Sequence, residues 1–265
     1  MKAITLITGA SAGIGTELAR VFAAHGHELV LIARRQDRLE ALADEIAATG
    51  KPRPVVLVAD LEQRDAAIKI RRQLLLLELE PEIVVNNAGF GLVGSATVLS
   101  CDEQLGMIDL NVRALTELSL IFAESLARHR GGILNVASVA AFLPGPSMAV
   151  YYATKAFVLS FSEALHRELA DRGVRVTALC PGPVVTEFQA RSGMSIDPAM
   201  RLILVPPDRV AQIGYHGLMR GKRVVVAGLG NKIAVLLLRF VPHALLLRIV
   251  DQRKRDRPSS SQQAS

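Results

Sequence analysis

The sequence predicts an α/β fold in which a doubly wound, Rossmann-like parallel sheet of about seven strands carries helices on both faces. Three observations indicate this class. Short apolar runs alternate along the chain with longer segments that have helical spacing. The apolar runs are continuous rather than alternating, which is typical of strands buried on both faces of a sheet. The length of 265 residues suits one large domain with an extensive core.

The first part of the chain shows the alternation clearly. Residues 3–8 are an apolar run that predicts a strand, and the spacing of the apolar residues after it predicts a helix over 14–25. A second apolar run predicts a strand over 28–33. The helix expected over 36–48 ends before Gly50, because glycine is a frequent helix terminator.

The rest of the chain repeats the pattern. The remaining strands are expected at 54–59, 82–86, 132–137, 174–180 and 223–227. The remaining helices are expected at 62–78, 102–129 and 151–171. Because crossovers between parallel strands are right-handed, the elements predict a doubly wound sheet whose ligand lies at the carboxyl ends of the strands.

The domain organisation predicted is simple. We expect one domain over 1–250, which includes an apolar C-terminal segment at 231–250. Residues 251–265 are charged and then rich in Ser and Gln, a composition that predicts a disordered tail.

Composition excludes several classes of protein. The chain has two cysteines, Cys101 and Cys180, which are too few for a disulfide scaffold and indicate a reduced, cytoplasmic protein. The net charge is +6, but Lys and Arg are dispersed except near the two ends, so we expect no nucleic-acid partner. The apolar run at the N-terminus is too short for a signal peptide or a membrane span.

A glycine-rich loop, Thr-Gly-Ala-Ser-Ala-Gly-Ile-Gly at 8–15, follows the first strand directly. Glycine allows a tight turn and the close approach of a pyrophosphate, and the N-terminus of the next helix offers free N–H groups to it. The residues expected to hold a dinucleotide here are Gly9, Ser11, Gly13, Ile14 and Gly15. A plain turn between strand and helix is the alternative interpretation.

The end of the second strand indicates which dinucleotide is bound. An acidic residue at this place binds the 2′-hydroxyl of NAD, whereas an arginine accommodates the 2′-phosphate of NADP. The chain has Arg34 and Arg35 here and no carboxylate before Asp37. We therefore expect NADP(H), with Arg34 as the main phosphate ligand. The alternative is that both arginines are solvated residues at the start of a helix.

A serine, a tyrosine and a lysine form the expected catalytic group. Tyr151 and Lys155 are one helical turn apart and on one helix face, so the ammonium can lower the pKa of the phenol toward neutrality. Ser138 ends the fifth strand and can hydrogen-bond a substrate oxygen. Tyr152 is a competing candidate, but position 156 is alanine, so it has no lysine four residues on.

Together the glycine loop and the Ser138, Tyr151 and Lys155 pattern resemble the short-chain dehydrogenase/reductase family, from residue 3 to about residue 188. The chain is similar to NADP-preferring members of the hydroxysteroid and 3-oxoacyl reductase kind. One departure is Ala12, since such relatives often carry a basic residue at that point of the loop.

The resemblance implies further cofactor contacts at strand ends. It gives Asp60 a hydrogen bond to the adenine amine and Leu61 a packing contact with the ring, although Asp60 can instead cap a helix that begins near Glu62. It makes Asn86 mainly structural. It places Asn87, Ala88 and Gly89 against the cofactor ribose.

The resemblance also implies contacts nearer the chemistry. The predicted nicotinamide loop is drawn from Pro181, Gly182, Val184 and Thr186, although a plain strand exit is the alternative. Asn111 is expected to be a fourth catalytic residue, which holds a water that links the lysine to solvent. Residues 189–205 correspond to a substrate lid in relatives.

These observations predict an NADP(H)-dependent enzyme that interconverts a carbonyl and an alcohol on a hydrophobic small molecule, with Tyr151 supplying the proton. The alternatives are a catalytically idle NADP-binding sensor and an NADP-dependent epimerase or dehydratase. No metal site is expected, since His243 has no second ligand at a recognisable spacing.

Two interaction surfaces are expected. Relatives pair the helices predicted at 102–129 and 151–171 into dimers or tetramers, and we expect a homodimer or homotetramer here. The apolar residues that motivate this are Leu115, Leu118, Ile121, Phe122, Phe157, Leu159 and Phe161. The segment 233–250 is apolar with interspersed cations, so it either contacts a membrane peripherally or packs over the substrate pocket or a neighbouring subunit.

Overall fold

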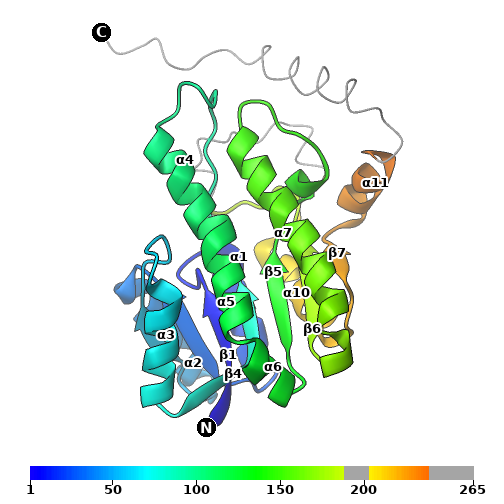
Figure 1. Cartoon of the computed structure of the whole chain (residues 1–265). Coiled ribbons are helices and arrows are strands. Elements are labelled where there is room, and N and C mark those ends of the chain that lie inside the picture. Colours follow the sequence, from blue (N-terminus) through cyan, green and yellow to red (C-terminus); the bar gives the residue numbers. More distant parts are fainter. Residues whose placement is uncertain (188–202, 239–265) are drawn as a thin grey trace.

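A computed structural model describes residues 1–187 and 203–238 of the chain. In this part of the chain, seven parallel strands form one sheet in the order β3-β2-β1-β4-β5-β6-β7 (Figure 1). The strands are β1 (Lys2–Thr8), β2 (Leu29–Ala33), β3 (Val55–Val58), β4 (Leu79–Asn86), β5 (Gly132–Val136), β6 (Arg175–Cys180) and β7 (Val224–Val226). The predicted fold class, a doubly wound parallel sheet of the Rossmann type, is confirmed.

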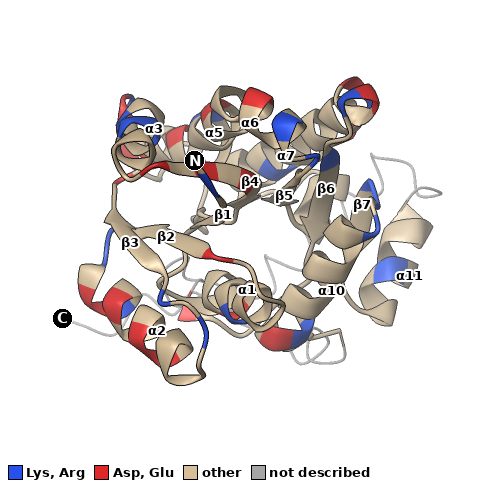
Figure 2. Ribbon diagram, turned by 90° about the horizontal axis from the view of Figure 1, so that it is seen from below, with Lys and Arg blue, Asp and Glu red and all other residues tan. Residues whose placement is uncertain are grey.

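Helices cover both faces of the sheet (Figure 2). One face carries α1 (Gly13–Ala24), α2 (Gln36–Ala48) and α10 (Pro207–Met219). The other carries α3 (Ala66–Leu76), α4 (Cys101–Ile108), α5 (Leu115–Ile121), α6 (Ala123–Arg128) and α7 (Ala149–Glu168). The last described helix, α11 (Leu229–Leu238), lies beyond the β7 edge of the sheet.

Side chains of the strands pack into a core on each face of the sheet, which explains their continuous apolar runs. Along β1, Ile4 and Leu6 pack into the core beneath α3 and α5, whereas Ile7 packs into the core beneath α1 and α2. Successive side chains of a strand point to opposite faces, so a strand covered on both faces needs apolar residues at every position. Few charged residues lie within the strands, and those on the helices and loops are coloured along the ribbon (Figure 2).

Strand β4 begins earlier than predicted. The strand predicted over 82–86 starts just after Pro81, which cannot donate a ladder hydrogen bond. In the structure β4 starts at Leu79, and its register with β1 shifts between Ile4 and Thr5, beside Pro81. The irregularity accommodates the proline within a central strand.

The helix expected over 62–78 begins later, at Ala66. The backbone N–H of Glu62 donates to the Asp60 carboxylate at 3.1 Å, and the N–H of Gln63 donates to the Asp60 carbonyl at 3.2 Å. Asp60 therefore stabilises a turn rather than capping the helix itself. The turn leaves Asp60 at the carboxyl edge of the sheet.

The helix expected over 102–129 is interrupted. Between α4 and α5, residues Asp109–Ala114 form a π-helical turn, and a change of backbone angles at Phe122 separates α5 from α6. Helical spacing of apolar residues cannot reveal such a turn, because it changes the hydrogen-bond pattern over only a few residues. Asn111 lies within this turn.

Helix α10 is missing from the elements predicted above. Its start carries clear signals, since Pro207 is at the first turn and Asp208 is in that turn. Val210, Tyr215 and Leu218 are buried against the face that also packs α1. These residues have helical spacing, so the helix could have been found from the sequence.

Four of the apolar residues that motivated the oligomer prediction belong to the protein's own core. Leu115, Leu118, Phe122 and Leu159 are each less than 10 % exposed. These four side chains therefore give no basis for an interface. Phe157, by contrast, is 40 % exposed.

Several predicted segments lie partly or wholly outside the described residues. They are most of the lid at 189–205, residues 239–250 of the apolar segment, and the tail at 251–265. Among the described residues, no helix is long and apolar enough to cross a membrane.

Candidate active site

A cleft of about 920 Å³ opens where the strands end. Its walls come from the loops that follow β1 to β6 and from the first turns of α7. The predicted site residues that line it are Gly9, Ser11, Gly13, Ile14, Arg34, Arg35, Asp60, Leu61, Asn87, Ala88, Gly89, Ser138, Tyr151, Lys155, Pro181, Gly182, Val184 and Thr186. Gly15 and Asn111 are the predicted residues that do not line it.

The glycine loop is shaped by close backbone contacts. Gly9 and Gly13 have positive φ angles of 65° and 57°, a conformation that side chains disfavour. A Cβ on Gly15 would lie 2.2 Å from the Gly9 carbonyl oxygen, so only glycine fits there. Gly15 thus allows the start of α1 to pack against the Gly9 backbone, although it does not face the cleft.

The loop after β4 braces the glycine loop. The Thr8 hydroxyl accepts hydrogen bonds from the backbone N–H groups of Asn87 and Ala88, at 3.0 and 3.1 Å. In return the Asn87 side-chain amide donates to the carbonyl oxygens of Thr8 and Gly9, at 3.0 and 3.2 Å. The two loops are therefore held together before any ligand binds. The glycine-rich cradle that they form fits the pyrophosphate of a dinucleotide.

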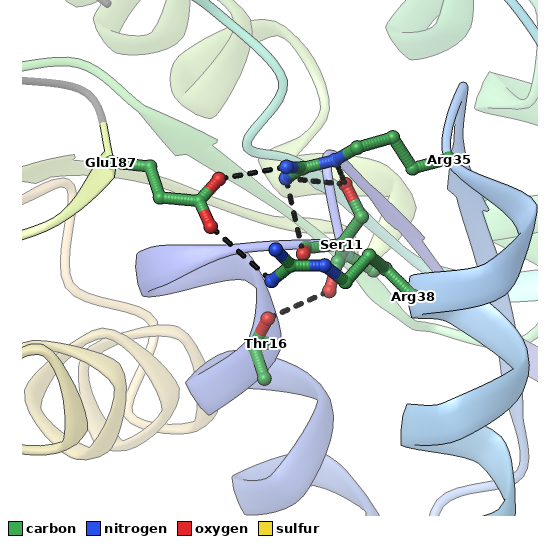
Figure 3. A network of polar contacts seen from close by, with 6 residues as sticks. Ser11, Thr16, Arg35, Arg38 and Glu187 are labelled. Atoms are coloured by element: carbon green, nitrogen blue, oxygen red, sulfur yellow. Dashed lines mark hydrogen bonds and ion pairs between the residues drawn. The ribbon is translucent and has the colours of Figure 1, made fainter. Parts of the chain in front are cut away.

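Two arginines stand at the end of β2, and each is paired with a carboxylate. Arg34 donates to Glu62 at 3.1 Å, and Arg35 donates to Glu187 at 2.8 Å. Arg35 also contacts Ser11 of the glycine loop (Figure 3). Both arginines line the cleft, while sequence reasoning did not foresee the two carboxylates.

Asn86 belongs to a buried polar ladder that crosses the sheet. Its amide donates to the Ser119 hydroxyl at 3.0 Å and to the Asn135 side-chain oxygen at 2.9 Å. The Asn135 amide donates onward to the Ser162 hydroxyl at 2.9 Å. The ladder ties α5 and α7 to β4 and β5, just below the cleft. Asn135 was not among the predicted residues, because a lone asparagine in an apolar strand gives no clear sequence signal.

The expected catalytic group, Ser138, Tyr151 and Lys155, lies where β5 ends and α7 begins. The Ser138 hydroxyl accepts from the Ala140 N–H at 3.1 Å and is hydrogen-bonded with Tyr151. The Lys155 ammonium donates to the Val136 carbonyl oxygen at 2.8 Å. It lies 5.9 Å from the centre of the Tyr151 ring.

Burial controls the titration of this group. It raises the pKa of Tyr151 to about 12, although the hydrogen bond with Ser138 opposes the shift. It lowers the pKa of Lys155 to about 8. The expected depression of the tyrosine pKa by the lysine is therefore absent from this geometry, because the ammonium faces the Val136 carbonyl and desolvation of the phenolate dominates.

Tyr152 lines the same cleft, and its ring centre is 6.1 Å from that of Tyr151. The ring packs closely on Gly145, where a Cβ would lie 2.4 Å from the ring atoms. Burial also raises the pKa of Tyr152. Tyr152 is thus placed as a wall of the cleft, next to the tyrosine that contacts Ser138.

Asn111 lies behind the cleft rather than in it, and is fully buried. Its amide donates to the Phe90 carbonyl at 2.9 Å and to the Thr154 hydroxyl at 3.1 Å, and its side-chain oxygen accepts from the Phe90 N–H at 3.1 Å. The Thr154 hydroxyl donates to the Tyr151 carbonyl at 2.7 Å. The Asn111 side chain therefore joins the loop after β4 to the start of α7.

The loop after β6 closes the cleft on its remaining side. Val139 N–H donates to the Pro181 carbonyl at 2.9 Å, which ties this loop to Ser138 and its neighbours. A Cβ on Gly182 would lie 2.4 Å from the Asn231 amide, and a Cβ on Gly13 would lie 3.0 Å from Thr186. Asn231, which sequence reasoning missed, is a buried support for this loop.

Comparisons with known proteins decide the family. The model of the short chain dehydrogenase family matches residues 3–195. The chain belongs to the short-chain dehydrogenase/reductase family. An uncharacterised oxidoreductase of Myxococcus xanthus is 36 % identical over 218 residues, which are 82 % of this chain and 83 % of that protein.

Solved structures agree with this assignment. A short-chain dehydrogenase from Sphingobium yanoikuyae in complex with NADPH is 30 % identical, with a TM-score of 0.79 over 100 % of this chain and 99 % of that one. A bulky-bulky ketone specific alcohol dehydrogenase from Comamonas testosteroni is 28 % identical, with a TM-score of 0.73 over 100 % of this chain and 96 % of that one.

The family makes this chain an oxidoreductase that uses an NAD(P) cofactor and a small-molecule substrate. The residues present fit such a cofactor, because the glycine cradle, the strand-end arginines and the Ser138, Tyr151 and Lys155 group share one cleft. Among the described residues, no cluster of three or more His, Cys, Asp or Glu side chains could hold a metal ion.

Proposed function

We propose that the protein is an NADP(H)-dependent reductase that converts the carbonyl group of a bulky, apolar small molecule into an alcohol. The observation that carries the proposal is the single cleft shared by Arg34, Arg35 and the Ser138, Tyr151 and Lys155 group. A cofactor with a 2′-phosphate can bind there, next to a substrate whose oxygen accepts a proton.

The preference for NADP(H) is supported by charge at the end of β2. Arg34 and Arg35 line the cleft, and no carboxylate stands at the position where NAD-binding proteins place one. Both arginines are shared with a carboxylate, but exposed ion pairs of this kind contribute about 0–1 kcal/mol. Hydrogen bonds between charged groups contribute about 1.5–3 kcal/mol, so a phosphate can compete with these carboxylates for the two arginines.

When bound, the nicotinamide supplies the hydride. Ser138 is placed to hydrogen-bond the substrate oxygen, and Tyr151 to donate a proton to it as negative charge develops. Because the pKa of Tyr151 is about 12, the phenol is protonated at neutral pH, which is the form that a proton donor needs. Lys155, with a pKa of about 8, is mostly charged at neutral pH. Its ammonium faces the Val136 carbonyl in the free protein, and we propose that it stabilises the phenolate once cofactor and substrate are bound.

A bulky, apolar substrate is supported by the apolar part of the cleft lining. The apolar and aromatic residues that line the cleft include Val139, Leu143, Tyr152 and Ile203. They offer no charged partner, so a polar substrate would lose its hydration without compensation. The similar enzyme from Comamonas testosteroni is specific for bulky ketones, in line with this proposal.

We also propose a homo-oligomer built on α4, α5 and α7. Leu105, Ile108, Leu120 and Phe157 are large apolar side chains that are 40 % or more exposed on these helices. They replace the core residues named above as the basis for an isologous interface. For the C-terminal segment, Leu229, Ile233 and Leu236 on α11 are exposed and support either a membrane contact or a subunit contact.

The decisive test is turnover of ketones, aldehydes and 3-oxoacyl thioesters by the full chain, with NADPH and NADH compared. We expect NADPH oxidation with bulky ketones and little with small polar ones. Tight NADPH binding without turnover of any substrate would instead indicate an idle cofactor-binding protein. Release of an isomerised or dehydrated product without net NADPH oxidation would indicate an epimerase or dehydratase.

A further inference from the structure

The carboxylate of Glu187 bridges two arginines beside the glycine loop (Figure 3). Its Oε2 accepts from Arg35 Nη1 at 2.8 Å, and its Oε1 accepts from Arg38 Nη1 at 3.3 Å. Arg35 Nη2 also donates to the carbonyl oxygen of Ser11 at 3.2 Å and to its hydroxyl at 3.3 Å. One anion thus lies between two guanidinium groups and close to a serine. This arrangement of donors also suits a phosphate.

Glu187 stands between two hollows of the surface. It lines the large cleft together with Arg34 and Arg35, and it also lines a second hollow of about 480 Å³ that includes Arg38. Ser11 lines both as well. The bridge therefore lies in the wall of the cleft beside Arg34, at the start of α2.

The bridge is exposed enough to be replaced. The side chains of Arg35, Arg38 and Glu187 are 43 %, 53 % and 51 % exposed. Water screens such ion pairs, and each changes an equilibrium by a factor of about five or less. Hydrogen bonding to Arg35 holds the pKa of Glu187 below its usual range, so the carboxylate is charged at neutral pH.

The other arginine–carboxylate pair is more firmly held. Glu62 is 25 % exposed on its side chain, and its backbone carbonyl accepts from Arg113 Nη2 at 2.8 Å. Its Oε2 lies 3.0 Å from the position of a Cβ on Gly106, so the carboxylate packs against α4. An incoming phosphate therefore displaces Glu187 more easily than Glu62.

We propose that Glu187 is an internal anion that competes with the 2′-phosphate of the cofactor for Arg35 and Arg38. It thereby determines how strongly the protein prefers NADP(H) to NAD(H). The inference rests on the proposed use of NADP(H) and adds Arg35, Arg38 and Glu187 to Arg34 as specificity-determining residues. In the free protein the carboxylate keeps the two guanidinium groups together, and the phosphate replaces it on binding.

The test uses Glu187→Gln, which keeps the shape and removes the charge. Glu40→Gln is the matched control, since Glu40 is also an exposed glutamate, lies on α2 and pairs with Arg53 instead. Dissociation constants for NADPH, NADH, adenosine 2′,5′-bisphosphate and 5′-AMP are measured by fluorescence titration and competition, without any turnover. Thermal melting of each variant checks that it is folded.

We expect Glu187→Gln to bind NADPH and the 2′,5′-bisphosphate about three- to tenfold more tightly, because two weak ion pairs no longer compete. NADH and 5′-AMP binding should stay within about twofold, and the gain should shrink at high salt. Glu40→Gln should leave all four constants unchanged. In an Arg35→Gln background, Glu187→Gln should lose most of its effect.

Unchanged or weaker NADPH binding by Glu187→Gln, relative to the control, would overturn the inference, because Glu187 would then only hold the arginines in place. If the proposed preference for NADP(H) is itself wrong, the dissociation constants show a different pattern. Wild type, Arg34→Gln and Arg35→Gln would then all bind NADPH and NADH with equal affinity, and both proposals would fall together. If wild type prefers NADPH through Arg34 or Arg35 but Glu187→Gln leaves NADPH binding unchanged, only the proposed competition by Glu187 is refuted.

Discussion

Replacement of Tyr151 by phenylalanine isolates the proton donor. The ring is 8 % exposed and packs in the core beneath α7, and the variant keeps all of its carbon atoms. The variant loses the hydroxyl and its hydrogen bond with Ser138, which lowers the free energy of unfolding by about 1 kcal/mol. A domain of ordinary stability tolerates this loss, since its free energy of unfolding is about 5–15 kcal/mol. The fold and the cleft should therefore remain.

The catalytic loss should be far larger. A positioned general acid contributes about 10²- to 10⁴-fold to the rate, or about 3–5 kcal/mol of barrier. We expect Tyr151→Phe to lower the single-turnover rate of NADPH oxidation by a factor within this range. The NADPH dissociation constant, from fluorescence titration, should stay within about threefold of the wild-type value.

Tyr152→Phe is the internal control. It removes a hydroxyl from the neighbouring ring, which lines the same cleft 6.1 Å away between ring centres. We expect it to retain nearly full turnover. If Tyr151→Phe stayed active while Tyr152→Phe lost activity, the assignment of the proton donor would be refuted.

Three further predictions address charge. The rate of reduction should fall above about pH 8, where Lys155, with its pKa lowered by burial to about 8, loses its charge; a pH–kcat profile that stays flat there would contradict this role. The double substitution Ala33→Asp with Arg34→Ala should reduce the ratio of NADPH to NADH affinity by about ten- to a hundredfold, as measured by titration, because it exchanges a phosphate partner for a hydroxyl acceptor. Glu82 accepts from His27 at 3.2 Å, and this hydrogen bond lowers its pKa below the usual 4.5. A depressed carboxyl pKa stabilises the fold above the unfolded pKa, and this is lost as the pH falls through the folded pKa. Urea unfolding should therefore show wild type more stable than Glu82→Gln at pH 6, with a difference that vanishes in stronger acid.

The sheet could be predicted from the sequence because its strands are buried on both faces. Val84 and Val85 illustrate this, since neighbouring residues of β4 enter opposite cores and both must be apolar. Parallel strands then bring their carboxyl ends to one edge. For this reason the residues that follow each strand, such as Gly9, Asp60 and Ser138, could be expected in one cleft before the structure was known.

What the sequence could not provide is long-range side-chain geometry. Arg35 and Glu187 are 152 residues apart, and nothing local indicates that they meet. The direction of the Lys155 ammonium is similarly hidden, since a spacing of four places it near Tyr151 but does not exclude the Val136 carbonyl as its acceptor. The catalytic role of Asn111 was implied by the resemblance alone, and the sequence does not show that the π-helical turn directs its amide to Phe90 and Thr154. In each case partners distant in sequence decide the role.

The contacts of Asn231 determine where the chain can be shortened to test the C-terminal segment. The buried Asn231 amide donates to the Ala227 carbonyl at 2.7 Å and to the Ile203 carbonyl at 3.0 Å, and it packs against Gly182. A chain that ends at Gly230 would lack this side chain, and the loop after β6 would lose its support. Loss of substrate affinity in that chain would therefore reflect damage to the cleft and could not distinguish a membrane contact from a subunit contact. A chain that ends at Leu238 keeps Asn231 and removes residues 239–265, which are the later apolar residues and the charged tail. It separates the two interpretations, because loss of binding to anionic vesicles with an unchanged oligomer indicates a membrane contact, and dissociation of the oligomer indicates a subunit contact.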